Sequence, residues 1–308
     1  MCTVVLVNKG DGYFGRNLDY DTDFGEKIVI VPKGFGFDFG GDHYAIIGMA
    51  VVENGYPLLF DGINEAGLGM AGLHFAGNAV YNEEVPDKMN VASYQLIPLV
   101  LSKCENVAKA RELLENVNIT NKAFSEAMPP SPLHWIIADK DGAVTVEQTE
   151  SGLHIYDNPV GVLTNNPQFP VQMLNLANYM HLSKHQPKNT FSDNLRLNHY
   201  SNGMGAMGLP GDMSSMSRFV KASYVRENSL YEDDEKSVVN HFFHTLYSVF
   251  QQRGCVRTEN GYEVTNYSSC CNLAKGIYYY TTYNDSTIRQ VRMQDFETNG
   301  DKLMEFEL

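Results

Sequence analysis

Short apolar runs separated by turn signals dominate the first third of the chain. Turns such as Lys9-Gly10-Asp11-Gly12 and Asn54-Gly55 interrupt these runs. Apolar runs of this length between such turns are typical of β-strands. The six predicted strands are Thr3–Val7, Tyr13–Asn17, Lys27–Val31, Ala45–Glu53, Pro57–Phe60 and Gly69–Phe75. The first two make a plausible hairpin.

Apolar residues recur at helical spacing over about 93–114 and again in three later stretches, which predicts helices there. These stretches are Val171–His181, Ser215–Glu227 and Lys236–Gln251. Further strands are expected at Leu133–Ala138, Val144–Gln148, Gly152–Tyr156, Gly161–Thr164, Gly276–Thr282 and Ile288–Met293. This order predicts two sheets packed together with helices outside them, in a single domain of residues 1–308.

Composition narrows the possible functions. The chain is 43% hydrophobic and 19% charged, which favours a folded protein with a sizeable core. Its net charge of −14 opposes binding to nucleic acid and to anionic membranes. The N-terminus lacks a basic segment followed by a long apolar stretch, so no signal peptide is expected. No apolar run reaches the ~18 residues of a membrane span. These features predict a cytoplasmic protein.

Cys2 is the first candidate for chemistry because of its position. The chain has five irregularly spaced cysteines, which match neither a disulfide framework nor a CxxC metal pair. Removal of Met1, which a small second residue favours, would expose the α-amine of Cys2 beside its own thiol. A neutral α-amine can then take the thiol proton and activate the nucleophile. The alternative is an ordinary buried cysteine at the start of a strand.

The segment Gly15-Arg16-Asn17-Leu18-Asp19 lies in the next predicted strand. Arg16 beside the thiol would favour the thiolate, and Asp19 would hold the α-amine in place. In regular strand geometry these two side chains project to opposite faces, so their spacing alone does not bring both to Cys2. A pair at this spacing is often a surface ion pair, which is the alternative interpretation.

Five ordered sequence blocks resemble the choloylglycine hydrolase family, which contains the bile salt hydrolases and the penicillin V acylases. Residues His134-Trp135 and Tyr279-Tyr280-Thr281-Thr282 add to the resemblance, which runs from Cys2 to at least Tyr283. The blocks are Met1-Cys2-Thr3, Gly15-Arg16-Asn17-Leu18-Asp19, Asn64-Glu65-Ala66-Gly67-Leu68, Leu163-Thr164-Asn165-Asn166-Pro167, and Leu209-Pro210-Gly211-Asp212 with Ser215-Met216-Ser217-Arg218-Phe219.

The resemblance implies an α+β N-terminal-nucleophile hydrolase fold, a four-layer αββα sandwich of two antiparallel sheets between helical layers. It implies that Cys2 is the nucleophile, that Arg16 and Arg218 tune it, and that Asp19 positions the amine. Asn165 would help to bind the oxyanion, with Asn166 as the second choice. We expect substitutions of Arg218 or Asp19 to act on activity and to leave stability nearly unchanged.

One block departs from the family pattern. His74 in Ala71-Gly72-Leu73-His74-Phe75 stands where bile salt hydrolases carry Asn and penicillin V acylases carry Tyr, at a second oxyanion or substrate contact. An imidazole N–H can also donate a hydrogen bond, so the change bears on substrate preference more than on activity. Tyr20, Phe24 and Phe60 flank the proposed site in sequence and either line an apolar pocket or are ordinary core residues.

The resemblance implies hydrolysis of the amide bond of glycine- or taurine-conjugated bile acids through a thioester on Cys2. A penicillin V or N-acyl-homoserine lactone acylase would share this chemistry. A homologue that binds sterols or acyl chains without catalysis is the third possibility, and the intact set of Cys2, Arg16, Asp19 and Arg218 speaks against it. No metal or organic cofactor is implied. A homo-oligomer, specifically a tetramer, is expected from the resemblance.

Overall fold

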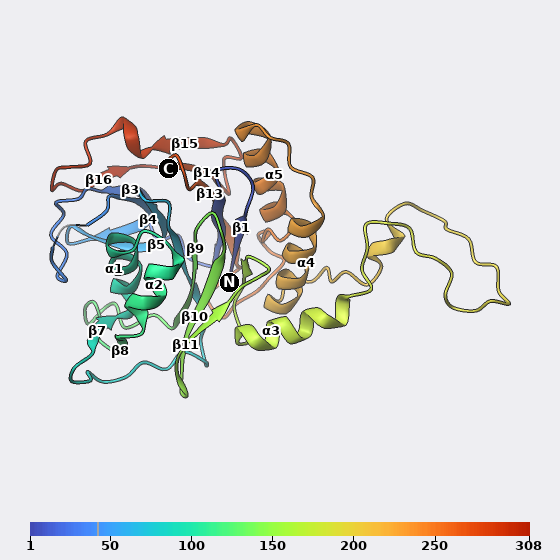
Figure 1. The fold of residues 1–308 in the computed structure, drawn as a ribbon, viewed down its shortest axis with the longest axis horizontal. Helices are drawn as coiled ribbons and strands as arrows, with labels where there is room; N and C mark the ends of the chain where they lie inside the picture. The colour runs from blue at the N-terminus through green and yellow to red at the C-terminus, as the bar shows by residue number, and fades with distance from the viewer. Residues whose placement is uncertain (42) are drawn as a thin grey trace.

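Two large antiparallel sheets form the middle of the protein (Figure 1). The computed structural model describes residues 1–41 and 43–308. The first sheet has six strands in the order β12-β1-β2-β13-β14-β15. Their bounds are β1 Cys2–Val7, β2 Tyr13–Tyr20, β12 Val162–Leu163, β13 Val264–Asn272, β14 Ile277–Thr282 and β15 Arg289–Arg292.

The second sheet has eight strands in the order β11-β10-β9-β6-β5-β4-β3-β16, and it packs face to face on the first. Its strands are β3 Lys27–Val31, β4 Ile46–Glu53, β5 Tyr56–Asn64, β6 Gly69–His74, β9 Leu133–Ala138, β10 Ala143–Thr149, β11 Gly152–Asp157 and β16 Met304–Phe306. A separate parallel pair is formed by β7 Met89–Ala92 and β8 Val117–Thr120.

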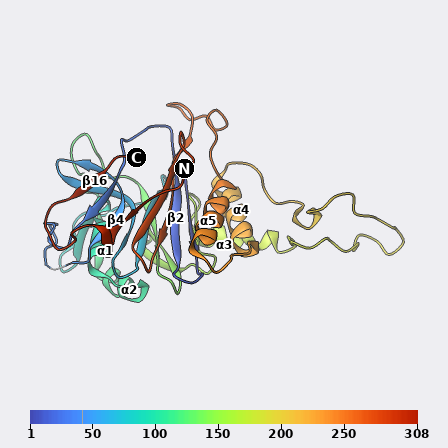
Figure 2. The same ribbon diagram turned by 90° about the horizontal axis from the view of Figure 1, so that it is seen from above.

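Helices cover the outer face of each sheet, which Figure 2 shows from above as successive layers. The helices α1 (Leu96–Lys103) and α2 (Val107–Leu114) lie on the second sheet. The helices α4 (Ser215–Asn228) and α5 (Glu235–Tyr247) lie on the first, and α3 (Phe169–Leu176) packs beside α4. The four-layer αββα sandwich predicted from the sequence is confirmed.

Burial on both faces explains the sequence pattern of the central strands. All six residues of β1 are buried, because one face packs on the second sheet and the other on α4 and α5. A strand covered on both sides gives a continuous apolar run instead of an alternating one. The second sheet likewise has apolar residues on both faces, one set between the sheets and one set under α1.

The central strand β13 is the main element that the sequence analysis missed. Its sequence, VTNYSSCCN, is too polar to stand out as a buried strand, yet its residues are almost entirely buried between β2 and β14. Its polar side chains are paired within the fold; Ser268 donates to Asn17 at 2.7 Å. A Cβ atom at Gly15 would lie 2.0 Å from the Ser269 carbonyl oxygen, so this approach of β2 to β13 requires glycine.

Several predicted boundaries are wrong by a few residues. The strand predicted to end at Phe60 continues to Asn64, and β2 continues to Tyr20 instead of ending at Asn17. The helix α3 ends at Leu176, five residues before the predicted end, and α5 ends at Tyr247 instead of Gln251. Within the described residues, no helix is both long and apolar enough to cross a bilayer.

A long segment of residues 181–213 projects away from the four layers, and we call it the arm (Figures 1 and 2). Its regular structure is limited to a short 3-10 helix at Met204–Ala206. Hydrogen bonds join its outgoing and returning halves, such as the 2.9 Å bond from the Gln186 side chain to the Ser201 carbonyl oxygen. The arm carries exposed apolar side chains at Phe191, Leu195, Leu197, Tyr200 and Met207.

A polar bridge crosses the apolar space between the two sheets. Arg16 of β2 donates from Nη1 to the carbonyl oxygens of Phe60 at 2.9 Å and Gly72 at 2.7 Å, both in the second sheet. In return Asp61 of β5 accepts hydrogen bonds from the hydroxyls of Tyr267 at 2.5 Å and Tyr278 at 2.7 Å, both in the first sheet. Burial raises the pKa of Asp61, and the charge of Arg16 opposes that rise.

We expect Asp61→Ala to lower the free energy of unfolding by at least about 2 kcal/mol. Two buried hydroxyls would lose their acceptor, and each such loss costs roughly 1–3 kcal/mol. Urea denaturation measures the change. The matched control is Asp193→Ala in the exposed arm, which should stay within about 0.5 kcal/mol of the unmutated protein. Equal stabilities of the two variants would contradict the structural role of the bridge.

Candidate active site

Cys2 begins β1, and its side chain lies between the two sheets with an exposed fraction of 3%. In the β1–β2 ladder Cys2 lies opposite Leu18, and Val4 lies opposite Arg16. Residues two apart on a strand share a face, so the Cys2 thiol and the Arg16 side chain point into the same space. Burial disfavours the charge of Arg16, but the negative charges of a Cys2 thiolate and of Asp61 raise its pKa above the ordinary value. Its Nη2 atom is buried without a hydrogen-bond partner among the described residues.

Asp19 projects to the other face of β2, toward the helical layer. Its Oδ1 atom accepts a hydrogen bond from Thr265 Oγ1 at 2.6 Å, and its Oδ2 atom lies 3.9 Å from Arg218 Nη1. Arg16 and Asp19 are 1% and 0% exposed, so the alternative of a surface ion pair is wrong. The expectation of opposite faces is met, and the two groups approach residue 2 from different sides.

Arg218, in the first turn of α4, joins the helical layer to the start of β1. Its Nη1 atom donates to the Cys2 carbonyl oxygen at 2.5 Å and to Thr3 Oγ1 at 2.7 Å, and its Nη2 atom donates to Asn165 Oδ1 at 2.8 Å. Burial lowers the pKa of Arg218, whereas the charge of Asp19 opposes that change. Burial raises the pKa of Asp19 in turn, opposed first by Arg218.

Asn165 follows β12 and contacts residue 2 directly. Its Oδ1 atom accepts a hydrogen bond from the Cys2 nitrogen at 2.8 Å, and its Nδ2 atom donates to the His74 carbonyl oxygen at 2.8 Å. The backbone N–H of Asn165 donates to Ser215 Oγ at 2.8 Å. The second choice, Asn166, instead donates to the Ala76 carbonyl oxygen at 2.6 Å. The geometry therefore favours Asn165 as the asparagine that acts on Cys2.

Glu263 is a residue near the site that the sequence analysis missed. The ammonium group of Met1 pairs with its carboxylate and also donates to the Asp19 carbonyl oxygen at 2.5 Å. Glu263 is 7% exposed, and its second oxygen has no hydrogen-bond partner among the described residues. It precedes the polar strand β13, where the sequence carries no signal of burial. While Met1 is present, the Cys2 nitrogen belongs to a peptide bond.

His74 ends β6 and is partly exposed. Its carbonyl oxygen accepts a hydrogen bond from the Asn165 amide, so the backbone of His74 is part of the site independently of its side chain. Partial burial lowers the pKa of the imidazole, and the N-terminal ammonium adds to the effect. The Glu263 carboxylate acts in the opposite direction.

An apolar cavity of about 440 Å³ adjoins the second-sheet residues that hold Arg16. Phe60 and Gly72, whose carbonyl oxygens accept from Arg16, both line it. Phe24 also lines it, and its ring lies 5.6 Å from that of Phe60. The prediction that these two aromatic residues line an apolar pocket agrees with the geometry. Small-molecule pockets typically have volumes of about 300–1,000 Å³.

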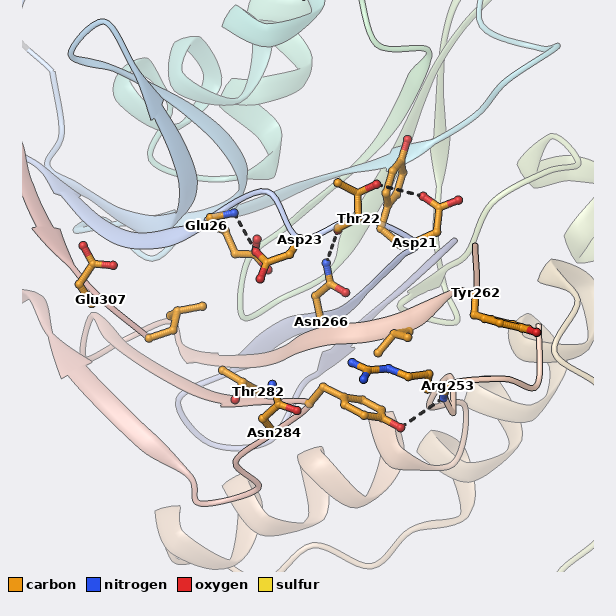
Figure 3. Close-up of a pocket in the computed structure, with 15 residues that line it drawn as sticks. Asp21, Thr22, Asp23, Glu26, Arg253, Tyr262, Asn266, Thr282, Asn284 and Glu307 are labelled. Carbon is orange, nitrogen blue, oxygen red and sulfur yellow. Dashed lines mark hydrogen bonds between the residues drawn. The ribbon is translucent and has the colours of Figure 1, made fainter. Parts of the chain in front are cut away.

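A second cavity, of about 590 Å³, is polar and is shown in Figure 3. Tyr20 lines this cavity instead of the apolar one, and its ring packs 4.8 Å from that of Phe24. The other lining groups include Asp21, Asp23 and Arg253. Figure 3 shows the carboxylates on one side and the guanidinium on the other. Among residues 1–41 and 43–308, no three His, Cys, Asp or Glu side chains are grouped to hold a metal ion.

Comparison with known protein families and sequences gives matches over the whole chain. A family model described as linear amide C–N hydrolases, choloylglycine hydrolase family, matches residues 2–306. A bile salt hydrolase/transferase of Lactiplantibacillus plantarum is 45% identical, over 100% of this chain and 97% of that protein. A bile salt hydrolase/transferase of Clostridium perfringens is 35% identical, over 98% of this chain and 95% of that protein.

Solved structures give the same result. A C2A mutant of the conjugated bile acid hydrolase from Clostridium perfringens superposes with a TM-score of 0.91 at 33% identity, covering 100% of this chain and 97% of that one. A penicillin V acylase from Agrobacterium tumefaciens superposes with a TM-score of 0.78 at 17% identity, covering 100% of this chain and 91% of that one. At that identity the second likeness shows a shared fold alone.

We expect Arg218→Lys to lower the free energy of unfolding by about 3 kcal/mol. Lysine cannot reproduce the planar set of donors, and each lost charge-assisted hydrogen bond is worth roughly 1.5–3 kcal/mol. From the sequence we expected substitutions of Arg218 to leave stability nearly unchanged. Because Arg218 is buried and hydrogen-bonded, we now expect a loss of stability. The matched control is Arg226→Lys on the same helix, whose guanidinium reaches the Leu6 carbonyl and Asn8 at the far end of β1. Chemical denaturation should show the smaller loss for Arg226→Lys, and the reverse order would contradict the arrangement.

Proposed function

Since the chain belongs to the choloylglycine hydrolase family of linear amide C–N hydrolases, we propose that it hydrolyses glycine- or taurine-conjugated bile acids with Cys2 as the nucleophile. One observation carries this proposal: three separate elements bring four charged and polar side chains to residue 2. Arg16 and Asp19 come from β2, Asn165 from the end of β12, and Arg218 from α4.

In the proposed reaction Met1 has been removed, and the Cys2 nitrogen is a free amine held by Asn165. The amine takes the thiol proton, and the thiolate attacks the amide carbonyl of the substrate. The Asn165 amide and backbone N–H groups stabilise the oxyanion, a contribution worth about 3–4 kcal/mol for a single donor. The leaving amine takes a proton from the Cys2 ammonium group. Water then attacks the thioester and releases the bile acid.

The proposed substrate combines a rigid apolar steroid with an anionic amide. The apolar cavity beside Phe60 and Gly72 offers a surface for the steroid next to the anchor of Arg16. The net charge of the chain is −14, so an anionic group needs local compensation, for which Arg16 and Arg218 are the candidates. The relatives named as bile salt hydrolases support this substrate class.

Two other functions are distinguishable from this one. A penicillin V acylase or N-acyl-homoserine lactone acylase would use the same groups around Cys2 and differ in the pocket. A non-catalytic sterol or acyl binder would keep the apolar cavity without needing the buried polar groups at residue 2. Burial of Arg218 and Asp19 at 1% and 0% exposure is costly without partners, and their convergence on Cys2 favours catalysis.

We further propose a cytoplasmic homo-oligomer, specifically a tetramer, in which each arm packs on another copy. The exposed apolar side chains of the arm support this proposal, since apolar patches of this kind mark sites of association. The single-domain organisation predicted for residues 1–308 stays a prediction. Both sheets contribute to the one apolar cluster between them, which favours it.

The unmutated protein should release glycine or taurine from conjugated bile salts faster than it cleaves penicillin V or an N-acyl-homoserine lactone. Cys2→Ser should fold normally and lose more than nine-tenths of kcat, because the α-amine is too weak a base to activate a hydroxyl well. Amine release from each substrate measures both effects. Faster cleavage of penicillin V would overturn the substrate assignment and leave the nucleophile standing, whereas an active Cys2→Ser would overturn the nucleophile.

His74→Asn should change the ratio of bile-salt to penicillin V turnover and flatten the pH profile. Burial lowers the pKa of His74, so the imidazole gains its charge below the ordinary value of ~6.5, and its effect on kcat/KM grows as pH falls through that region. We expect bile salts to remain the better substrates of both forms. Initial rates between about pH 5 and 7 test this, and identical ratios and profiles would place the side chain outside the site.

Replacing residues 188–198 of the arm by two glycines should reduce the oligomer to smaller species. The two ends of this stretch approach each other, since the His199 Nε2 atom lies 2.6 Å from the Pro187 carbonyl oxygen, so a short link can close the gap. The deletion removes Phe191, Leu195 and Leu197 from the surface. Light scattering after size-exclusion chromatography measures the mass. An unchanged tetramer would show that the arm does not hold the copies together, and a monomeric unmutated protein would refute the tetramer itself.

A further inference from the structure

His134 of β9 and Glu147 of β10 form a fully buried polar pair behind the proposed site, and both side chains are 0% exposed. The His134 Nδ1 atom lies 3.1 Å from Glu147 Oε1, and the Nε2 atom lies 2.8 Å from the Thr164 carbonyl oxygen. The same Glu147 oxygen accepts a hydrogen bond from the Phe169 backbone N–H at 2.9 Å, at the start of α3.

The hydrogen-bond partners of His134 define where its protons lie. A carbonyl oxygen only accepts, so Nε2 must carry a hydrogen. A neutral imidazole then has a bare Nδ1 lone pair facing Glu147 Oε1, an atom that already accepts a hydrogen bond from Phe169. A carboxylate that accepts at Oε1 from both Nδ1–H and the Phe169 N–H satisfies both donors. Its Oε2 atom is buried without a hydrogen-bond partner among the described residues. The arrangement therefore fits an imidazolium ion and a carboxylate.

The pair is joined to the proposed catalytic groups on two sides. Thr164, whose carbonyl oxygen binds the imidazole, immediately precedes Asn165. On the other side the His134 ring stacks on Phe75, with centroids 4.2 Å apart and planes 5° from parallel. Phe75 follows His74, whose carbonyl oxygen holds the Asn165 Nδ2 atom. Two connections of Asn165 thus lead back to His134: its chain link to Thr164 and the hydrogen bond from its Nδ2 atom to the His74 carbonyl oxygen.

We propose that His134 and Glu147 form an imidazolium–carboxylate pair that positions Asn165 for its part in the reaction. This role rests on the proposed function of Asn165, which touches residue 2, whereas His134 and Glu147 act through the segment that carries it. Other titratable groups surround the pair. His74 of β6 interacts electrostatically with His134, and Tyr156 of β11 with Glu147. His154 of β11 lies opposite Glu147 in the β10–β11 ladder.

The protonation state is measured first, in ¹⁵N-histidine-labelled protein at neutral pH. His134 should show one-bond N–H couplings at both ring nitrogens, with its signals assigned by their absence in His134→Phe, provided that variant folds. In Glu147→Gln, which keeps the shape of the side chain and removes its charge, the ring should retain a single N–H. One N–H in the unmutated protein would overturn the pair whatever the activities are.

The positioning role is measured by kinetics on the same Glu147→Gln variant. Because Asn165 acts on the transition state, kcat should fall about 10–100-fold while KM changes little. An unchanged kcat in a folded Glu147→Gln variant would overturn the positioning role.

The matched control is His43→Phe. His43 also lies between two carbonyl oxygens, those of Tyr44 at 2.9 Å and Phe35 at 3.0 Å. Among the described residues, its contacts do not include the groups of the site. This variant should lose stability with kcat intact, so an equal loss of kcat in both variants would show a general structural effect instead. Asn165→Ala separates the two proposals: full activity in that variant would refute the role of Asn165, while the coupling experiment would still decide the state of His134.

Discussion

The first residues of β1 are buried in the middle of a sheet, and each polar group there needs a partner inside the protein. A buried and unpaired polar group costs roughly 1–3 kcal/mol, and an unpaired charge costs more. The Cys2 nitrogen therefore meets Asn165, and the Cys2 carbonyl oxygen meets Arg218. Because the buried backbone groups at this strand end need hydrogen-bond partners, residues from β2, from the end of β12 and from α4 converge on it. The proposed chemistry uses those same groups.

The two faces of the sheet at β1 each carry a buried arginine, and different groups hold each one. On the face toward the second sheet, Arg16 lies among apolar residues and is held by the carbonyl oxygens of Phe60 and Gly72, with Asp61 nearby. On the helical face, Arg218 lies between Asp19 and Asn165. Neither guanidinium is held by a hydrogen bond to the Cys2 thiol. Arg16 binds carbonyl oxygens of the second sheet, and Arg218 binds the Cys2 carbonyl oxygen, Thr3 and Asn165. A thiolate formed at Cys2 would interact favourably with both of these preorganised cations.

Much of the fold could be predicted from the sequence, because most strands and helices bury continuous or periodic apolar runs. The polar strand β13 could not, because its burial depends on pairing with β2 and β14, and no local pattern reports that pairing. The candidate residues Cys2, Arg16, Asp19, Asn165 and Arg218 were found through ordered blocks that resemble a family. Spacing alone predicts opposite faces for Arg16 and Asp19, and the structure shows why both are nonetheless beside residue 2.

Glu263 and Glu147 show the limit of that approach. A single acidic residue before a polar segment reads as a surface group, and its burial follows only from the packing of the whole sheet. Tyr20 shows a related limit. Its position next to Phe24 suggested one apolar pocket, yet the direction of its side chain in β2 places it in the wall of the polar cavity instead.

The most direct test of the central claim is mass spectrometry of protein quenched during turnover of taurocholate. The account predicts a chain that begins at Cys2, with a transient increase equal to a cholyl thioester. Peptide mapping should locate that adduct on the N-terminal peptide. An active protein that retains Met1, or an adduct on any other residue, would contradict a mechanism based on an N-terminal cysteine.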